Sequence, residues 1–459
     1  MNRVPLVLAS LACVLGTTAC SLGTTARMGT GIVSHTVCTA VFVSGIDGDA
    51  AYQAALVPMP AIGAFDWGLR YRVDRPHRRV TTTLLGGYEE TASYEDGAGC
   101  QSHPGGHPAP LPIDADGAGP DVVAPTSAAL QSAIDGAFAP TASGDGQRTK
   151  AVVVMHHGVI VGERYATGYG VSTPVPGYSD TKSVMSALAG VLVREGKLDP
   201  MAPAPIATWA TDRRHAITID HLLRMRSGLA WDESLSGGAD DAARMWFLEP
   251  DMASLPLSRG VAWTPGSRWQ YTSGNSVVVA RIVRDLAGGT GDDVLRFAER
   301  ELFAPLGMHH VVLALDATGT PNGASGMLAS PRDWARFGEL YLADGKVGEQ
   351  RILPEGWVTY AASPQSDAWV GYGAGFWTNR GESEGARRRR NWGMPEGSFF
   401  ASGIFGQVIL VDPADDLVIA RFGWSHGNFG GLEEISHHVG AIVAAVRGAQ
   451  ENRASKGAM

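Results

Sequence analysis

The stretch Tyr178-Ser179-Asp180-Thr181-Lys182-Ser183 is followed by a mostly apolar segment that runs from Val184 to Gly196. In this segment the apolar residues at positions 184, 188, 191 and 192 have helical spacing, and Gly196 stands where a helix ends. Ser179 and Lys182 therefore lie at the helix start, three residues apart on one face. This is the S-x-x-K arrangement of a serine nucleophile with a lysine partner.

Ser179 also has a purely structural alternative, because serine is a favoured N-cap of helices. Lys182 favours a functional site, since a cation in the first helical turn opposes the helix dipole at a cost of about 0.3–1 kcal/mol. The positive helix end and a buried setting would lower the lysine pKa and let the amine act as a base. The chain has five lysines, and only Lys182 follows a serine by three residues.

The composition is that of a globular protein. With 459 residues, 44% hydrophobic and 18% charged, the chain has room for two or three domains. A net charge of −9 argues against a nucleic-acid binder. The chain has no C-x-x-C spacing that would indicate a metal site, and no cofactor is expected. The basic run Arg387 to Arg390 is interpreted as a solvated loop, with a position at the substrate rim as the alternative.

Residues 1–20 have the features of an export signal. A single Arg3 precedes a mostly apolar run from Val4 to Leu15, which is too short to span a bilayer. Small residues stand before Cys20, as at a bacterial lipoprotein processing site. We therefore expect an exported protein, either periplasmic or attached to the membrane through lipidated Cys20; an ordinary cleaved signal is the alternative.

Two of the four cysteines, Cys13 and Cys20, belong to this leader, and Cys38 and Cys100 remain. In an oxidising compartment these two suggest a disulfide; two buried free thiols are the alternative. They stand near the ends of an N-terminal extension, residues 21–100, in which Val37 to Ser44 and parts of 67–85 have strand-like patterns. Residues 101–125 are rich in proline, glycine and aspartate and are expected to be a linker. The main domain is expected over residues 126–459.

Strand-like segments stand at both ends of this main domain. A strand and its hairpin partner are expected at 151–155 and 159–165, and further strands at 408–411 and 417–422. Helical patterns cover 128–138 and 433–446 at its two ends and several segments between 197 and 395. We therefore expect an α+β fold in which both ends share one antiparallel sheet, flanked by N- and C-terminal helices, with an inserted α-helical region.

Further residues can complete the chemistry of Ser179 and Lys182. Tyr271 is the candidate for relaying a proton to the leaving group, with a buried structural tyrosine as the alternative. The Gly403-Ile404 backbone can aim an N–H at the reacting carbonyl and, with the N–H of Ser179, form an oxyanion hole. Its alternative is a β-bulge at a glycine.

Three ordered motifs carry a family resemblance: Ser179-Asp180-Thr181-Lys182, Tyr271-Thr272-Ser273-Gly274-Asn275, and Ala401-Ser402-Gly403-Ile404-Phe405-Gly406-Gln407. With them, residues 145–448 resemble the serine β-lactamase and penicillin-binding-protein superfamily, in its class C-like branch with family VIII esterases and 6-aminohexanoate-dimer hydrolases. The resemblance implies catalytic roles for Ser179, Lys182 and Tyr271, and an oxyanion donor at the backbone of Ile404. Further candidate pocket residues are Ser273, Asn275, Ser402, Gly403, Trp377 and Trp392.

The sequence departs from the family pattern at two places. Ser273 stands where many β-lactamases have asparagine, and Ala401-Ser402-Gly403 lacks the lysine of the Lys-Thr-Gly motif, which helps hold the antibiotic's carboxylate. We therefore expect a serine hydrolase that cleaves a small-molecule ester or amide through an acyl-enzyme. The alternatives are a β-lactamase or D-Ala-D-Ala carboxypeptidase, and a binding or sensor protein that is acylated without turnover.

Overall fold

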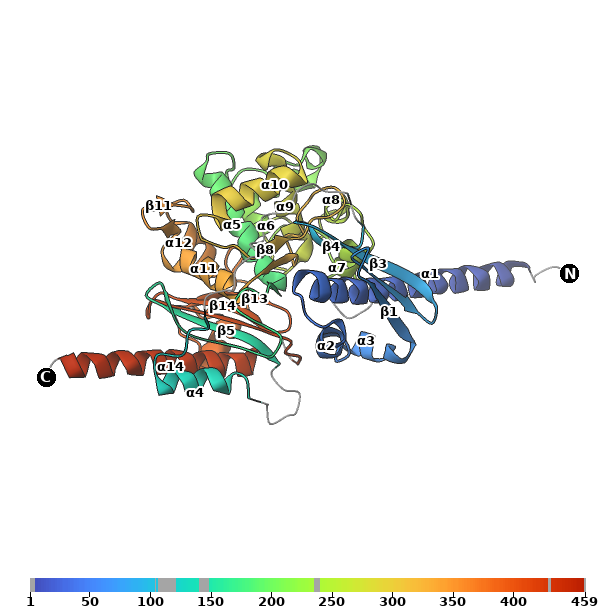
Figure 1. The fold of residues 1–459 in the computed structure, drawn as a ribbon. Helices are drawn as coiled ribbons and strands as arrows, with labels where there is room; N and C mark the ends of the chain where they lie inside the picture. The colour runs from blue at the N-terminus through green and yellow to red at the C-terminus, as the bar shows by residue number, and fades with distance from the viewer. Residues whose placement is uncertain are drawn as a thin grey trace.

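The computed structural model describes residues 5–103, 105, 121–139, 148–234, 240–427 and 431–457. Its central element is a six-stranded antiparallel sheet (Figure 1). In spatial order the strands are β12 (Trp377–Thr378), β13 (Phe399–Gly403), β14 (Gln407–Asp412), β15 (Leu417–Gly423), β5 (Thr149–His156) and β6 (Val159–Tyr165). Because β15 pairs with β5, segments from both ends of the main domain share one sheet, as the sequence predicted.

Helices cover both faces of this sheet (Figure 1). On one face α4 (Ala128–Gly136) packs beside α14 (Leu432–Gly457), and their apolar residues form one cluster with alternate residues of the strands. Ser127 caps α4 by accepting a hydrogen bond from the backbone N–H of Leu130 at 3.1 Å. On the other face α11 (Pro331–Leu342) lies against β15, β14 and β5.

A helical region is inserted between β6 and β12, and its core joins the second face of the sheet. Its helices include α5 (Thr181–Arg194), α6 (Ile219–Leu223), α7 (Asp241–Phe247), α8 (Ser254–Ser258), α9 (Ser273–Ala287), α10 (Gly291–Ala298), α12 (Trp357–Ala362) and α13 (Glu384–Asn391). A small sheet within it contains β7 (Val175–Pro176), β9 (Met327–Ala329) and β8 (Val311–Leu313), and β10 (Lys346–Val347) pairs with β11 (Gln350–Arg351). The fold is thus the expected α+β arrangement with an α-helical insert.

The N-terminal region packs helices against a separate four-stranded sheet. Its elements are α1 (Pro5–Cys38), η1 (Thr39–Val43), α2 (Gly48–Ala51), η2 (Tyr52–Leu56), α3 (Pro60–Gly63), β1 (Leu69–Asp74), β2 (Arg79–Leu84), β3 (Gly87–Glu95) and β4 (Gly99–Gln101). The predicted disulfide between Cys38 and Cys100 is present and joins the end of α1 to β4.

The strand expected over Val37 to Ser44 is wrong, because this segment is helical. The β-branched residues there suggested a strand, but Val33, Val37 and Val41 recur every four residues and are all buried in one cluster. Spacing of this kind places them on one helical face. Packing of that face against β2 and β3 outweighs the local β-propensity.

The structure describes only parts of the expected leader and linker. α1 begins at Pro5, and none of the helices in the described ranges is long and apolar enough to span a membrane. The side chain of Cys20 is outside the described residues, so its lipidation stays a prediction. Most of the expected linker, residues 104 and 106–120, also lies outside them.

Candidate active site

Ser179 lies in a single 3-10 turn, Tyr178–Asp180, that leads directly into α5. Lys182 is in the first turn of α5, and its Nζ donates a hydrogen bond to Ser179 Oγ at 3.0 Å. Only 3% of the Lys182 residue is exposed, whereas Ser179 is half-buried and lines a cavity. The S-x-x-K spacing therefore places the predicted base in contact with the predicted nucleophile, whose side chain borders the cavity.

The position of Lys182 in the first helical turn is compensated by specific acceptors. Its Nζ donates to the backbone oxygen of Ala324 at 2.9 Å and to Ser273 Oγ at 3.3 Å, in addition to Ser179. Desolvation by burial lowers the pKa of Lys182 to about 8, against the opposing effects of Glu233 and Asp180. A lysine with this pKa is partly neutral near pH 8 and can take the proton of Ser179.

Tyr271 is positioned just before α9, and its ring centroid is 4.8 Å from Lys182 Nζ. Desolvation, and then Tyr372, raise the pKa of Tyr271 well above its ordinary value, and a hydrogen bond with Ser179 acts in the opposite direction. The phenol therefore keeps its proton at neutral pH. This arrangement suits Tyr271 as a proton donor to a leaving group more than as the first base.

Glu233 connects the second motif to the lysine, and no sequence pattern predicted it as a site residue. Its carboxylate accepts hydrogen bonds from Ser273 Oγ at 2.5 Å, from Ser273 N at 2.8 Å and from Trp231 Nε1 at 2.5 Å. Its negative charge also raises the pKa of Lys182. Asp180 provides a weaker counter-charge, because burial raises the pKa of its own carboxyl well above the ordinary value. Glu233 stands alone in a loop, and no sequence spacing relates it to the S-x-x-K motif.

The segment before Ser179 lies in direct contact with the end of β13. A Cβ atom on Gly403 would be 2.1 Å from the backbone oxygen of Gly177, and one on Gly177 would be 2.4 Å from Trp334. Glycine at both positions thus allows β13 to approach the nucleophile turn. Ile404, which follows β13, lines the same cavity as Ser179. This proximity fits the expected oxyanion hole, which stays a prediction.

The backbone is strained on both sides of this contact. Tyr178 has φ 47° and Phe405 has φ 66°, in the left-handed region that costs non-glycine residues about 1–3 kcal/mol each. The two rings pack edge to face with centroids 5.4 Å apart, and both contact Trp424. Packing of the three aromatic rings therefore holds the backbone that precedes Ser179 and the backbone that follows Ile404.

The other predicted pocket residues lie around the site and outside the cavity lining. Asn275 is buried and accepts a hydrogen bond from Ser227 Oγ at 2.7 Å. Trp377 supports Tyr271, with ring centroids 5.7 Å apart. Ser402 pairs with Val408 in the sheet. Trp392 is half-buried at the end of α13. Of the predicted pocket residues, Ser273 is a cavity-lining residue.

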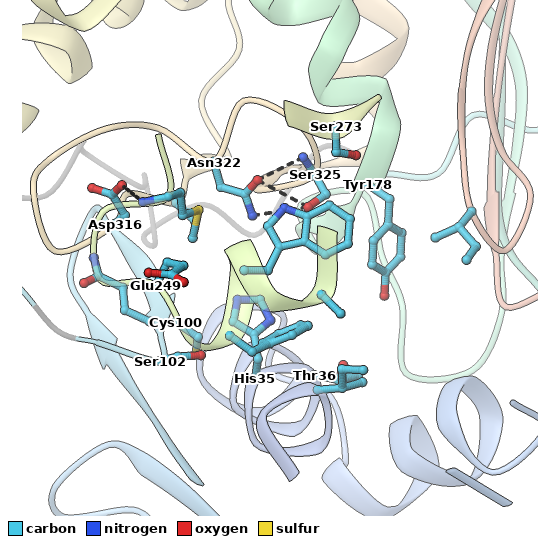
Figure 2. Close-up of a pocket in the computed structure, with 18 of the residues that line it drawn as sticks. His35, Thr36, Cys100, Ser102, Tyr178, Glu249, Ser273, Asp316, Asn322 and Ser325 are labelled. Atoms are coloured by element: carbon cyan, nitrogen blue, oxygen red, sulfur yellow. Dashed lines mark hydrogen bonds between the residues drawn. The ribbon is translucent and has the colours of Figure 1, made fainter. Parts of the chain in front are cut away.

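The cavity at Ser179 has a volume of about 210 Å³ (Figure 2). It is lined by residues of the helical insert, of the segment after β13 and of the N-terminal region. The described lining residues include neither lysine nor arginine, but they include the carboxylates of Glu233, Asp240, Glu249 and Asp316. Within the described ranges, no cluster of three or more His, Cys, Asp or Glu side chains could hold a metal ion.

Comparison with known proteins now adds to this geometry. The family model for beta-lactamases matches residues 134–429, which is more than half of the chain. The chain belongs to the beta-lactamase family. The match covers Ser179, Lys182, Tyr271 and Ile404 and excludes the N-terminal region. The chain is thus a hydrolase of the family that its motifs indicated.

Curated relatives and solved structures agree with this family. A 6-aminohexanoate-dimer hydrolase from Paenarthrobacter ureafaciens is 26% identical, over 60% of this chain and 72% of that protein. Protein Rv1367c of Mycobacterium tuberculosis is 30% identical, over 52% of this chain and 75% of that protein. The fold is shared with a family VIII carboxylesterase (TM-score 0.55, 16% identity, 71% of this chain and 99% of that one). It is also shared with a penicillin-binding protein homologue from Caulobacter crescentus (TM-score 0.54, 19% identity, 71% of this chain and 100% of that one).

Within this beta-lactamase family, the arginine run could have replaced the missing lysine of the third motif. It was expected to be a loop, but it lies within α13. Arg389 is buried and donates to Asn379 Oδ1 at 2.7 Å and to Thr378 O at 2.8 Å. Arg390 donates to the backbone oxygens of Asn379 and Gly381 at 2.7 and 2.6 Å. These two arginines therefore stabilise the backbone at and after β12 through hydrogen bonds. Neither of them lines the cavity at Ser179.

The Glu233→Gln variant tests the electrostatic role of that carboxylate. Removing its charge removes an effect that raises the pKa of Lys182, so the lysine should lose its proton at lower pH. We expect the acidic limb of the pH profile of kcat/KM to move to lower pH. The surface variant Glu355→Gln serves as the matched control, with an unchanged profile. An unmoved limb in a folded Glu233→Gln protein would contradict the role of Glu233.

Proposed function

We propose that the protein is an exported serine hydrolase that cleaves an ester or amide through an acyl-enzyme on Ser179. The observation that carries this proposal is the contact of Lys182 Nζ with Ser179 Oγ, 3.0 Å apart at the wall of a cavity. Neutral Lys182 takes the proton as Ser179 Oγ attacks the carbonyl carbon. Tyr271 gives its proton to the leaving group as the acyl bond breaks, and the Lys182 ammonium returns a proton to the Tyr271 phenolate. In the second half-reaction Lys182, together with Tyr271, takes a proton from the attacking water and returns it to Ser179 Oγ as the acid leaves.

The charge of the cavity supports a substrate without a carboxylate next to the reacting carbonyl. None of the described lining residues is lysine or arginine, while four are acidic. The third motif, Ala401-Ser402-Gly403, also offers no cation. An anionic substrate would therefore meet like charges in a desolvated site, which is unfavourable. This favours esters and amides over β-lactam antibiotics and D-Ala-D-Ala peptides.

Export and attachment through Cys20 belong to the same proposal. They are supported by the leader pattern of residues 1–20 and by the Cys38–Cys100 disulfide, a bond typical of oxidising compartments. The name of the Paenarthrobacter relative refers to an amide, which makes amides candidates beside esters.

A substrate panel tests the proposal. The full-length protein would be assayed with p-nitrophenyl esters, with anilides as amides, and with nitrocefin as a β-lactam. We expect turnover of esters or anilides with kcat/KM at least about tenfold above that for nitrocefin, because a buried unpaired charge costs more than 1.4 kcal/mol. Preferred turnover of nitrocefin would favour the β-lactamase alternative. A single burst of product without steady turnover of any substrate would favour the acylated sensor.

A further inference from the structure

The N-terminal region, residues 22–103, is joined to the catalytic part by hydrogen bonds. Arg148 Nη1 donates to the backbone oxygens of Gln53 and Ala54, both at 3.2 Å. In a second contact between the two parts, the N–H of Leu315 donates to the backbone oxygen of Ala98 at 3.3 Å. The acceptors of all three hydrogen bonds are backbone oxygens of the N-terminal region. These bonds therefore fix the backbone of this region against the catalytic part.

Apolar contacts between the two parts are close and centre on the strained residues beside Ser179. Phe405 and Trp424 belong to the hydrophobic cluster of the N-terminal region, and Tyr178 packs against it. A Cβ atom on Gly31 in α1 would lie 3.0 Å from Cβ of Phe247 in α7. The N-terminal region therefore supports the same aromatic rings that hold the nucleophile turn.

The cavity that contains Ser179 is bounded by this region. Its N-terminal lining includes Ile32, His35, Thr36, Leu56, Met59 and Cys100. Figure 2 shows His35 and Thr36 on α1, across from Tyr178 and Ser273. The family model begins at residue 134, so this wall is supplied by a part of the chain outside the family match.

Ile32, Leu56 and Met59 give this wall an apolar part, and polar Gln101, Ser102 and His103 lie beside it at and after β4. Ile32, Leu56 and Met59 line the same cavity as the rings of Trp246 and Phe247, and the four carboxylates named above lie among the lining residues contributed by the catalytic part. His35 adds no positive charge at neutral pH, because desolvation lowers its pKa to about 4 against a hydrogen bond with the backbone of Cys100. A hydrocarbon group is the ligand that gains most from such a surface.

We propose that residues 22–103 form the acyl-selecting wall of the catalytic cavity and that this wall favours an apolar, uncharged acyl chain of medium length. The inference rests on the proposed function, since it names the acyl group of the same reaction. It assigns specificity to Ile32, Thr36 and Met59, which lie in a part of the chain where no catalytic motif is found.

A larger side chain on this wall should reduce the space of the cavity and change the preference for acyl chain length. The Thr36→Trp variant places an indole where a small side chain now borders the cavity. We expect kcat/KM for p-nitrophenyl octanoate to fall about tenfold or more, since hydrophobic pockets discriminate by roughly 10–200-fold per methylene. The value for p-nitrophenyl acetate should stay within about twofold, because its acyl group lacks the longer hydrocarbon chain by which octanoate extends into the cavity. Leu22→Trp, at a residue of the same helix that is 69% exposed, is the matched control and should change neither value.

A second variant and labelling of Ser179 distinguish failure of this inference from failure of the proposed function. Ile32→Ala enlarges the cavity and should raise the laurate-to-octanoate ratio of kcat/KM, which keeps the test valid where Thr36→Trp does not fold. Unchanged acyl ratios in folded variants whose Ser179 still reacts with a fluorophosphonate would overturn the inference and leave the proposed function standing. A wild-type protein that hydrolyses no ester and leaves Ser179 unlabelled would overturn both.

Discussion

Replacing Ser179 with alanine should lower kcat/KM by about 10⁴-fold or more for every ester that the wild-type protein hydrolyses. Among the described residues, two hydroxyls accept a hydrogen bond from Lys182 Nζ and border the cavity, and the variant removes that of Ser179 and leaves that of Ser273. Ser273 does not substitute, because its hydroxyl is committed to the Glu233 carboxylate at 2.5 Å. Without a nucleophile the acyl-enzyme cannot form, and only binding and oxyanion stabilisation remain.

The control for this variant is Ser267→Ala. Ser267 is exposed, and its hydroxyl donates to the backbone oxygen of Thr264 at 2.7 Å, away from the cavity. It should retain wild-type kcat/KM, and both variants should show wild-type circular dichroism. Retention of even a tenth of the activity by a folded Ser179→Ala protein would contradict the role of Ser179.

Replacing Lys182 with methionine should lower kcat by about 10²–10⁴-fold, the range expected for loss of a general base. Methionine fills similar space but cannot accept the proton of Ser179. The sign of the pH dependence follows from the same residue. Because Lys182 acts in its neutral form and its pKa is about 8, wild-type kcat/KM should fall by about tenfold per unit as pH drops below that value.

The measurement is the pH profile of wild type beside those of Lys182→Met and Lys197→Met. Lys197 follows the same helix, and its side chain is 50% exposed in a pair with Glu195. The Lys197 variant should keep both the rate and the acidic limb, whereas Lys182→Met should lose the limb. A Lys182→Met protein with an unchanged limb near pH 8 would assign that limb to another group.

The sequence was sufficient to predict the elements that depend on local patterns. Helical spacing after Ser179 predicted α5, and runs rich in apolar and β-branched residues predicted β5, β6, β14 and β15 near their observed bounds. The order of three motifs then predicted that Lys182 and Tyr271 meet Ser179. Each of these features is a periodic pattern or a short motif, so neighbouring residues carry the information.

Other features depend on contacts between distant residues and could not be predicted in this way. Glu233 reaches Ser273 across 40 positions of sequence, and nothing in its local surroundings marks it. The helix at Val37 was hidden by β-branched residues, although its four-residue spacing was visible. The N-terminal wall of the cavity arises where α1 meets α7, a contact that no local pattern encodes.

The most direct test of the account is mass spectrometry of the protein quenched during turnover of a slow anilide or ester. We expect an intact mass increased by that of the acyl group, with the adduct on the peptide that contains Ser179. The Ser179→Ala protein should carry no adduct. Steady turnover by wild type with an unmodified Ser179 peptide, or with the acyl group on a different residue, would contradict the central claim.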